Sequence, residues 1–223
     1  MRLTTAIVAF VLLGLVPAHA TIVNVTLTGQ VANNAIVNPP LGAVAPGTPV
    51  VLSFQVDSDD YIDGLPGDMR SYAIDPFSFS LSFDSLVQVG LKNPFPDGST
   101  PYFTLVDGAP ENDGFFVGTA YWYPNGLPMS EEPYELNVDL EYGGDMLDSL
   151  DIVDAGGIYD FDGLVRYSFD LWALTPSNVV MGISFGQLTI EVPQVNPTNP
   201  LPVPGALWML GSALVGMAGL RRR

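Results

Sequence analysis

Apolar and polar residues alternate one by one along most of this chain, and this pattern limits its fold more than any other feature. In PFSFSLSFDS, residues 76–85, every second residue from Phe77 to Phe83 is apolar and serines stand between them. In YELNVDLEY, residues 134–142, apolar side chains alternate with acidic residues and an asparagine. Because successive side chains of a β-strand point to opposite faces, each stretch predicts a strand with one buried and one solvated face.

Strands of this kind account for the whole body of the chain. Further alternating runs occupy residues 23–31, 50–56, 87–91, 102–106, 115–121, 165–171, 179–185 and 188–192. About ten short antiparallel strands can bury their apolar faces by pairing two sheets. We therefore predict an all-β domain over residues 21–192, an antiparallel β-sandwich of jelly-roll type. A barrel would show the same alternation.

The N-terminal segment has the three parts of a secretory signal peptide. Arg2 precedes an apolar run of eleven residues, 6–16, and Pro17 leads to Ala18, His19 and Ala20, a small-x-small cleavage site. We predict a helical signal peptide over residues 1–20 that is cut after Ala20. The alternative, an uncleaved membrane helix, conflicts with the roughly 20 apolar residues that a bilayer span requires.

Two residue types are missing from the predicted mature chain. His19 is the single histidine and falls within the signal peptide, and the sequence contains no cysteine. This excludes a Ser-His-Asp triad, a cysteine nucleophile, a zinc site of His/Cys type and a haem held by His or Cys. It also excludes disulfides, so stability outside the cell has to come from packing or bound ions.

The body of the chain is strongly acidic. All 24 acidic residues lie between Asp57 and Glu191, where only three basic residues stand, a formal balance of −21. Such a surface repels nucleic acid and anionic lipid and favours cations or neutral partners. We therefore expect no nucleic-acid partner.

The C-terminal segment has the layout of a short membrane span. A Pro/Asn-rich linker, PQVNPTNP, occupies residues 193–200, and proline keeps it extended. Residues 205–220 carry no charge and would form a helix of about 24 Å, short for a hydrocarbon core of roughly 30 Å. The three arginines that follow should stay cytoplasmic, which leaves the body outside. We predict transient insertion in the inner membrane through this transmembrane helix.

The same segment resembles a known sorting signal. Pro202-Val203-Pro204-Gly205 and Trp208-Met209-Leu210-Gly211-Ser212 are similar to the proline motif and the tryptophan core of the PEP-CTERM sorting domain, in its variant with a VPLPA-like start. An apolar helix and a basic cluster follow in the order of that family, so the resemblance covers residues 201–223. The residues that carry it are Pro202, Val203, Pro204, Gly205, Trp208, Gly211, Arg221, Arg222 and Arg223.

This resemblance implies a processing route. PEP-CTERM tags are recognised by exosortase, an integral-membrane enzyme of Gram-negative bacteria that make exopolysaccharide, and are cut near the proline motif. Val203 and Gly205 depart from the commonest glutamate and alanine, which bears on the subtype of exosortase. The strands ATIVNVTLTGQV and TPVVLSFQVDSDD also resemble exported proteins of this group. The alternative for the tail is a permanent single-span anchor.

Two acidic stretches are candidate calcium sites. DSDDYIDGLPGD starts at Asp57, and DMLDSLDIVDAGGIYDFDG starts at Asp145. Calcium takes six to eight oxygen ligands from flexible, acid-rich loops, and both stretches read as such loops, although neither matches an EF-hand. The candidate ligands are Asp57, Asp59, Asp60, Asp63, Asp151 and Asp154. The alternative is that both stretches are solvated loops without an ion.

AYWYP, around Trp122, is a candidate sugar-binding segment. Flat aromatic side chains beside carboxylates can stack on sugar rings, but alternation points Trp122 away from Tyr121 and Tyr123, as in ordinary core strands. Catalysis is open only to carboxylates, as in a glycosidase with paired Asp and Glu, and no motif nominates a pair.

We therefore expect a non-enzymatic, exported surface or matrix protein without catalytic residues. We expect it to be associated with exopolysaccharide and biofilm. The alternative is a carbohydrate-binding protein or a carboxylate-based glycoside-active enzyme.

Overall fold

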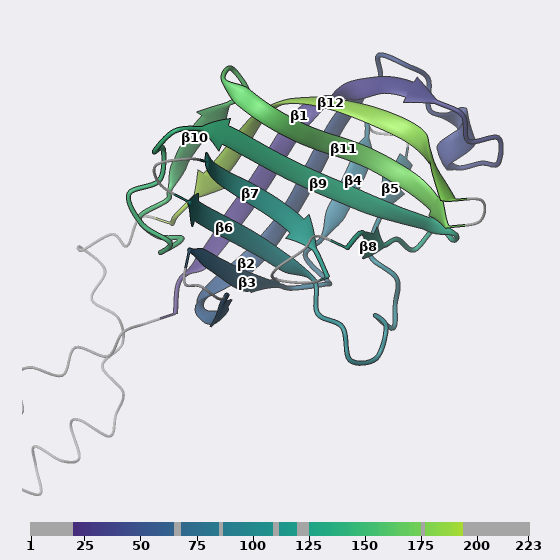
Figure 1. The fold of residues 1–223 in the computed structure, drawn as a ribbon. Helices are drawn as coiled ribbons and strands as arrows, with labels where there is room; N and C mark the ends of the chain where they lie inside the picture. The colour runs from purple at the N-terminus through teal and green to yellow at the C-terminus, as the bar shows by residue number, and fades with distance from the viewer. Residues whose placement is uncertain are drawn as a thin grey trace, which may run out of the picture. The chain divides into compact units, whose positions relative to one another are not determined.

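The computed structural model describes residues 20–64, 68–84, 87–108, 112–119, 125–174 and 177–193 (Figure 1). These residues form twelve strands and one short 3-10 helix. In chain order they are β1 (Ile22–Asn34), η1 (Leu41–Ala43), β2 (Pro49–Asp63), β3 (Met69–Ile74), β4 (Ser80–Phe83), β5 (Val87–Val89), β6 (Tyr102–Gly108), β7 (Asn112–Gly118), β8 (Leu127–Pro128), β9 (Tyr134–Gly143), β10 (Gly157–Asp160), β11 (Leu164–Leu174) and β12 (Ser177–Glu191). The predicted all-β class is confirmed.

All twelve strands belong to one antiparallel sheet, and its main path of hydrogen bonds closes on itself. The path runs β1-β12-β11-β9-β7-β6-β3-β2, and β2 pairs again with β1. Three short additions lie off this path: β4 and β5 extend from β2, β8 pairs with β9, and β10 pairs with β12. Antiparallel pairing, which the single-residue alternation predicted, therefore holds throughout the described strands.

The order of the strands differs from the predicted jelly roll. A jelly roll contains two Greek keys, in which strands distant in the chain lie side by side. Here, apart from the additions, each strand of the closed path pairs with the next one along the chain, as in a meander. Alternation predicts where strands occur but says nothing of which strands pair, so this part of the prediction had no support from the pattern.

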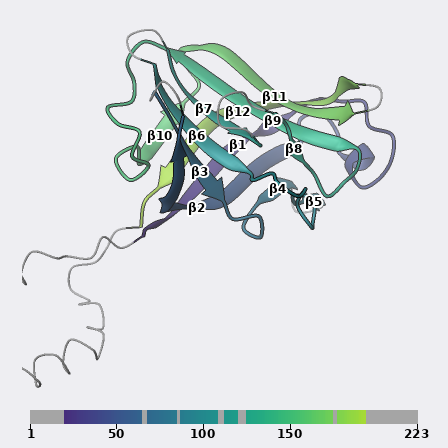
Figure 2. The same ribbon diagram turned by 60° about the horizontal axis from the view of Figure 1, so that its bottom comes forward.

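The strands lie in two layers that cover one core. Figure 1 shows β3, β6, β7, β9 and β11 side by side, with β1 and β2 crossing behind them, and Figure 2 shows the separation of these layers. Aromatic rings join the layers at the centre. The ring of Phe54, on β2, lies 5.5 Å from that of Phe103, on β6, which in turn stacks on Phe115, on β7, at 5.9 Å. All three side chains are buried.

Burial follows the predicted alternation in β9 but not at the start of the 76–85 run. Leu136, Val138 and Leu140 are buried, as expected. Phe77, in contrast, is 87% exposed, because β4 begins only at Ser80. The carboxylate of Asp75 accepts a hydrogen bond from the backbone N–H of Phe77, which forms a turn and breaks the strand there.

A β-bulge explains why one strand, β12, was predicted as two. Residues opposite Thr28 and Gly29 of β1 are Gln187 and Phe185, so Gly186 is left over in the pairing. An extra residue reverses which face each later side chain occupies. The buried hydrophobic residues of β12 accordingly stand at odd positions up to Phe185 and at even positions from Leu188 onward. The two strands also approach closely here, since a Cβ on Gly29 would lie 2.2 Å from the Ser184 carbonyl oxygen.

The predicted terminal helices lie outside the described residues. The signal peptide, except Ala20, and the sorting segment 201–223 belong to this undescribed part. Within the parts of the chain that the structure describes, no helix combines the length and hydrophobicity needed to cross a bilayer.

Candidate metal centre

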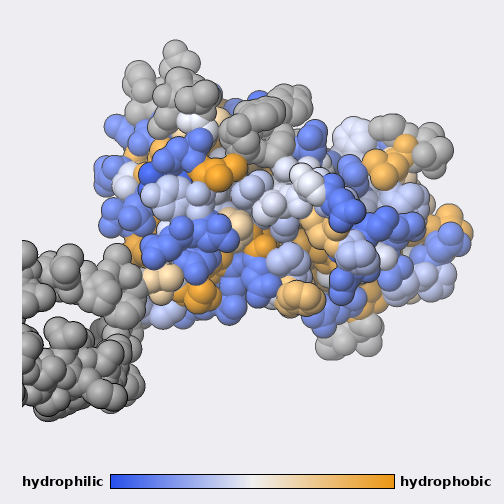
Figure 3. Space-filling view, turned by 90° about the horizontal axis from the view of Figure 1, so that it is seen from below, coloured by the Kyte–Doolittle hydropathy of each residue, from blue (hydrophilic) through white to orange (hydrophobic). Residues whose placement is uncertain are grey.

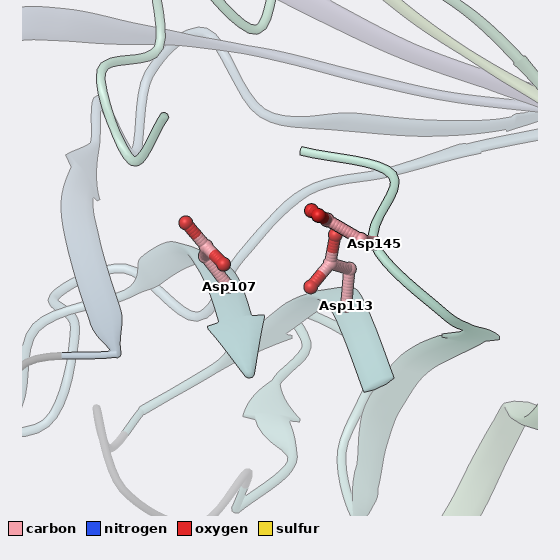
Figure 4. A group of neighbouring side chains, drawn as sticks. All are labelled: Asp107, Asp113 and Asp145. Carbon is pink, nitrogen blue, oxygen red and sulfur yellow. The ribbon is translucent and has the colours of Figure 1, made fainter. Parts of the chain in front are cut away.

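Three aspartates from three separate segments meet at one end of the sheet. Asp107 lies near the end of β6, Asp113 near the start of β7, and Asp145 just after β9. Each offers a carboxylate oxygen, and the three oxygens lie within 4.8 Å of one another (Figure 4). Among the described residues, no other group of three or more His, Cys, Asp or Glu side chains meets this spacing. We call these three residues the aspartate cluster.

Strand pairing brings two of the three together. In the β6–β7 hairpin, Asp107 pairs with Asp113, and the next pair on the same face is Leu105 with Phe115. Leu105 and Phe115 are fully buried, so the two aspartates continue the inward face of the hairpin at its end. Side chains directly opposite each other in an antiparallel pair are close neighbours.

A glycine turn brings in the third. β9 pairs with β7, placing Tyr142 opposite Asp113. Gly144 then has a positive φ of 96° and forms an isolated bridge with Asn112. Glycine adopts this conformation without steric penalty, which lets the chain turn back so that Asp145 reaches the cluster.

Asp113 is buried and only half satisfied. It is 0% exposed, and its Oδ2 accepts hydrogen bonds from the backbone N–H groups of Met146, at 2.5 Å, and Leu147, at 2.6 Å. Its Oδ1 is also buried and has no hydrogen-bond partner among the described residues. A buried carboxylate oxygen without a partner is costly, which makes this atom the strongest sign of a missing ligand.

The basic side chains of the described residues form ion pairs outside the aspartate cluster. Each forms an ion pair with another carboxylate: Arg70 with Asp63, Lys92 with Glu132, and Arg166 with both Asp139 and Glu141. Two like charges about 4 Å apart repel by roughly 1 kcal/mol in water and roughly 4 kcal/mol near a protein surface. The aspartate cluster would therefore be stabilised by a cation.

The donor set suits a hard cation. Three carboxylate oxygens, with no nitrogen or sulfur, are the ligands that Ca²⁺ and Mg²⁺ prefer. Ca²⁺ binds oxygens at about 2.3–2.6 Å, so two of its ligands can lie up to about 5 Å apart, which matches the spacing here. Remaining coordination positions would fall to water and backbone carbonyls.

The predicted calcium ligands lie elsewhere. Asp57, Asp59, Asp60 and Asp63, which we call the acidic segment, belong to β2 and not to a loop, because β2 continues to residue 63. β2 is irregular here, because Val56 pairs with Ile74 and Tyr61 already pairs with Tyr72, so residues 57–60 bulge out of the pairing with β3 while Asp63 lies within it. Asp63 bonds Arg70 at 2.6 Å. The structure does not gather the acidic segment into a three-carboxylate group.

The second predicted pair lies in a turn. Asp151 and Asp154 are both exposed, and the carboxylate of Asp151 accepts a hydrogen bond from the backbone N–H of Val153 at 2.9 Å. Only Asp145, from the same acidic stretch, joins the aspartate cluster. The other predicted site residues, Trp122, Ala18 and the sorting motif, lie outside the described residues, while Ala20 is exposed just before β1.

Sequence reasoning missed Asp107 and Asp113, although a signal was present. Each stands at a position where the alternation predicts an apolar, inward-facing residue: Asp107 follows Phe103 and Leu105, and Asp113 precedes Phe115. A charged residue on the buried face of a strand is unusual unless it has a partner. Charged residues at inward-facing strand positions, rather than stretches dense in acids, indicate Asp107 and Asp113 as site residues.

Two carboxylates of β9 have raised pKa values, but they do not form a catalytic pair. Burial raises the pKa of Glu135, and burial also raises the pKa of Asp139, opposed by the Arg166 guanidinium at 2.5 Å. They lie four residues apart on one strand, about 13 Å. Glycosidases place their two carboxyl groups roughly 5–9.5 Å apart, so these two do not form such a pair.

Comparison with known proteins identifies no relative of this chain: no family model matches it, and neither a curated protein nor a solved structure is significantly similar to it. The functional inference therefore depends on the features of the sequence and the geometry described above.

Proposed function

We propose that this chain is an exported, non-catalytic β-sandwich protein of the cell surface or extracellular matrix, delivered by an exosortase and associated with exopolysaccharide in a Gram-negative bacterium. The observation that carries the proposal is the order of features at the C-terminus. A linker, a proline motif, a short apolar stretch and three arginines follow one another within residues 193–223. A PEP-CTERM-like tag requires this order.

The described domain is compatible with removal of such a tag. Its last strand, β12, pairs with β1, β10 and β11, and ends at residue 191. The linker begins at residue 193, so cleavage near Pro202 would leave every described strand in place. The two crossing layers support the sandwich architecture that we propose for the secreted form.

The surface suits a hydrated environment. The face shown in Figure 3 is largely hydrophilic, with hydrophobic residues in separate small groups. Together with the formal charge of the body, this supports neutral or cationic partners in a polysaccharide-rich matrix. The coloured part of this face has no broad apolar patch for a partner.

Intact mass of the protein from its native cells, in membrane and medium fractions, tests the proposal. We expect a released form that lacks residues 1–20 and the residues beyond about position 201, with added mass at the new C-terminus if the protein is attached to surface material. Persistence of the full apolar tail and the three arginines in the membrane fraction alone would refute sorting and leave a tail-anchored surface domain.

One observation favours a second function, direct contact with polysaccharide. Tyr167, on β11, is 67% exposed, and its ring lies beside that of Phe169 at 5.6 Å, which stacks on Phe161 at 5.4 Å. These rings line a shallow cavity of about 220 Å³. Aromatic rings in such a hollow are a common sugar-binding arrangement.

Binding of exopolysaccharide from the native cells to the full-length protein tests this second function. If the hollow binds sugar, Tyr167→Ala should weaken binding about tenfold. Phe77→Ala removes an even more exposed aromatic ring, 87% against 67%, that does not line the hollow, and should leave binding unchanged. Equal loss in both variants, or in neither, would rule out the hollow as the sugar site.

A further inference from the structure

We infer that the aspartate cluster is a calcium site that joins the β6–β7 hairpin to the segment following β9. This site is independent of the sorting proposal and differs from the calcium ligands expected from sequence. It depends on where strand pairing places Asp107, Asp113 and Asp145.

The three carboxylates converge at one end of the sheet. Figure 4 shows the carboxylates of Asp113 and Asp145 close together, with that of Asp107 approaching from the neighbouring strand. Their oxygens lie within 4.8 Å of one another, which is about twice a Ca²⁺–oxygen distance. One ion could therefore contact an oxygen from each residue.

The carboxylate of Asp113 is held in one orientation. Two backbone N–H groups, from Met146 and Leu147, hold its Oδ2, so the carboxylate cannot easily rotate. This fixes Oδ1, which is buried and lacks a hydrogen-bond partner among the described residues. A carboxylate held in this way is prepared to bind a cation with its free oxygen.

The irregular ligand set and the exposure of the cluster indicate which ion binds and how it enters. Ca²⁺ tolerates irregular oxygen sites with water in several positions, whereas Mg²⁺ demands near-ideal octahedral geometry at shorter distances. The cluster collects its ligands from two strand ends and a loop, an irregular set that suits Ca²⁺. Asp145 is exposed and Asp107 is partly exposed, so the ion can enter from solvent.

The ion would act as a cross-link in a chain that has no disulfide. The segment after β9 contributes Leu147 and Ile152 to the core. Its middle is held by Tyr72, on β3, whose hydroxyl donates to the carbonyl of Leu150 and accepts from the N–H of Ile152. Calcium at Asp145 would fix the beginning of the same segment to the hairpin.

The test is calorimetric titration of the chelator-treated, full-length protein with Ca²⁺, paired with thermal unfolding. We expect one saturable site with a Kd on the order of 10⁻⁴–10⁻³ M, as in extracellular calcium modules, and a Tm that rises with Ca²⁺. Asp145→Asn and Asp107→Asn should each weaken binding at least tenfold. Asp60→Asn, the same charge change in the acidic segment, should alter the Kd less than twofold.

Three outcomes would overturn the inference: no saturable binding by the wild type, wild-type affinity in both Asp145→Asn and Asp107→Asn, or equal weakening by Asp60→Asn. Equal affinity for Mg²⁺ would overturn the assignment to calcium. Asp113→Asn is a poor sole test, because it also weakens two backbone hydrogen bonds and can impair folding. Asp145 is exposed, and among the described residues no backbone N–H group donates to its carboxylate, so Asp145→Asn is a cleaner test than Asp113→Asn.

Discussion

The acidic segment and the aspartate cluster show two opposite ways of placing carboxylates in a β domain. The acidic segment has four aspartates within seven residues of β2, yet the structure does not bring three of their carboxylates together. The aspartate cluster takes one residue from each of three distant segments and brings their oxygens within 4.8 Å. In an all-β chain, local density of acids therefore says little about a cation site, and strand pairing decides which carboxylates meet.

The two regions also differ in how their charge is compensated. Asp63 of the acidic segment is about half exposed and pairs with Arg70. Asp113 of the cluster is fully buried and relies on two backbone N–H groups. Exposed pairs contribute little to stability, whereas buried charges are costly to disturb. Substitutions should therefore have much larger effects in the cluster.

The largest expected effect comes from Asp113→Ala. It leaves the backbone N–H groups of Met146 and Leu147 without an acceptor, and we expect the free energy of unfolding to fall by about 2–4 kcal/mol. Urea denaturation of the full-length protein in chelator measures this change. The matched substitution in the acidic segment, Asp60→Ala, should change it by less than about 0.5 kcal/mol. Similar losses in both variants would contradict the comparison.

Tyr72→Phe should have the next largest effect. The Tyr72 hydroxyl makes two hydrogen bonds, at 2.7 and 2.9 Å, to the segment that follows Asp145. Its loss leaves buried backbone groups unpaired and should lower the free energy of unfolding by about 1–3 kcal/mol. Tyr61→Phe, an exposed tyrosine of β2, serves as the control and should be neutral within about 0.5 kcal/mol. An unchanged free energy of unfolding in Tyr72→Phe would show that these two hydrogen bonds do not stabilise the domain.

Alkaline pH should destabilise the cluster end of the domain. Burial raises the pKa of Tyr142 to about 12, from an ordinary value of 10.0, and burial also raises the pKa of Tyr72. The unfolded chain would lose these protons first, so stability is complete below pH 10 and falls as pH rises toward 12. Unfolding midpoints across this range measure the slope. Tyr142→Phe should reduce the fall of stability with pH. An unchanged slope would mean that other groups cause the loss of stability.

The smallest effect is expected at the ion pair of the acidic segment. Asp63→Asn removes an exposed partner of Arg70 and should cost less than about 1 kcal/mol. The difference should shrink further in high salt, because exposed pairs are screened. A loss as large as that of Asp113→Ala would mean that the acidic segment, and not the cluster, stabilises this part of the domain.

Most strands could be predicted because their inner and outer faces differ. The alternation in β1, β6 and β9 identified the buried apolar residues, but Thr104 of β6 and Asp139 of β9 are buried as well. β3, MRSYAI, escaped notice because Ser71 and Tyr72 are both fully buried, which removes the alternation. β2 was expected to end sooner, because residues 57–60 are polar on both faces and resemble a loop.

The candidate site could not be assembled from the sequence for a different reason. Asp107 and Asp113 are adjacent only because β6 and β7 form a hairpin in one register, and Asp145 reaches them through the turn at Gly144. The two interruptions of the inward-facing pattern, at Asp107 and Asp113, were visible in the sequence, but their meeting with Asp145 depends on tertiary structure.

The most direct test of the central claim is an anomalous difference map from crystals of the protein grown with calcium. We predict one strong peak, which marks an ion bound by oxygens of Asp107, Asp113 and Asp145. A peak along the acidic segment instead, or no ordered ion at the cluster, would contradict the view that strand pairing builds the cation site in this domain.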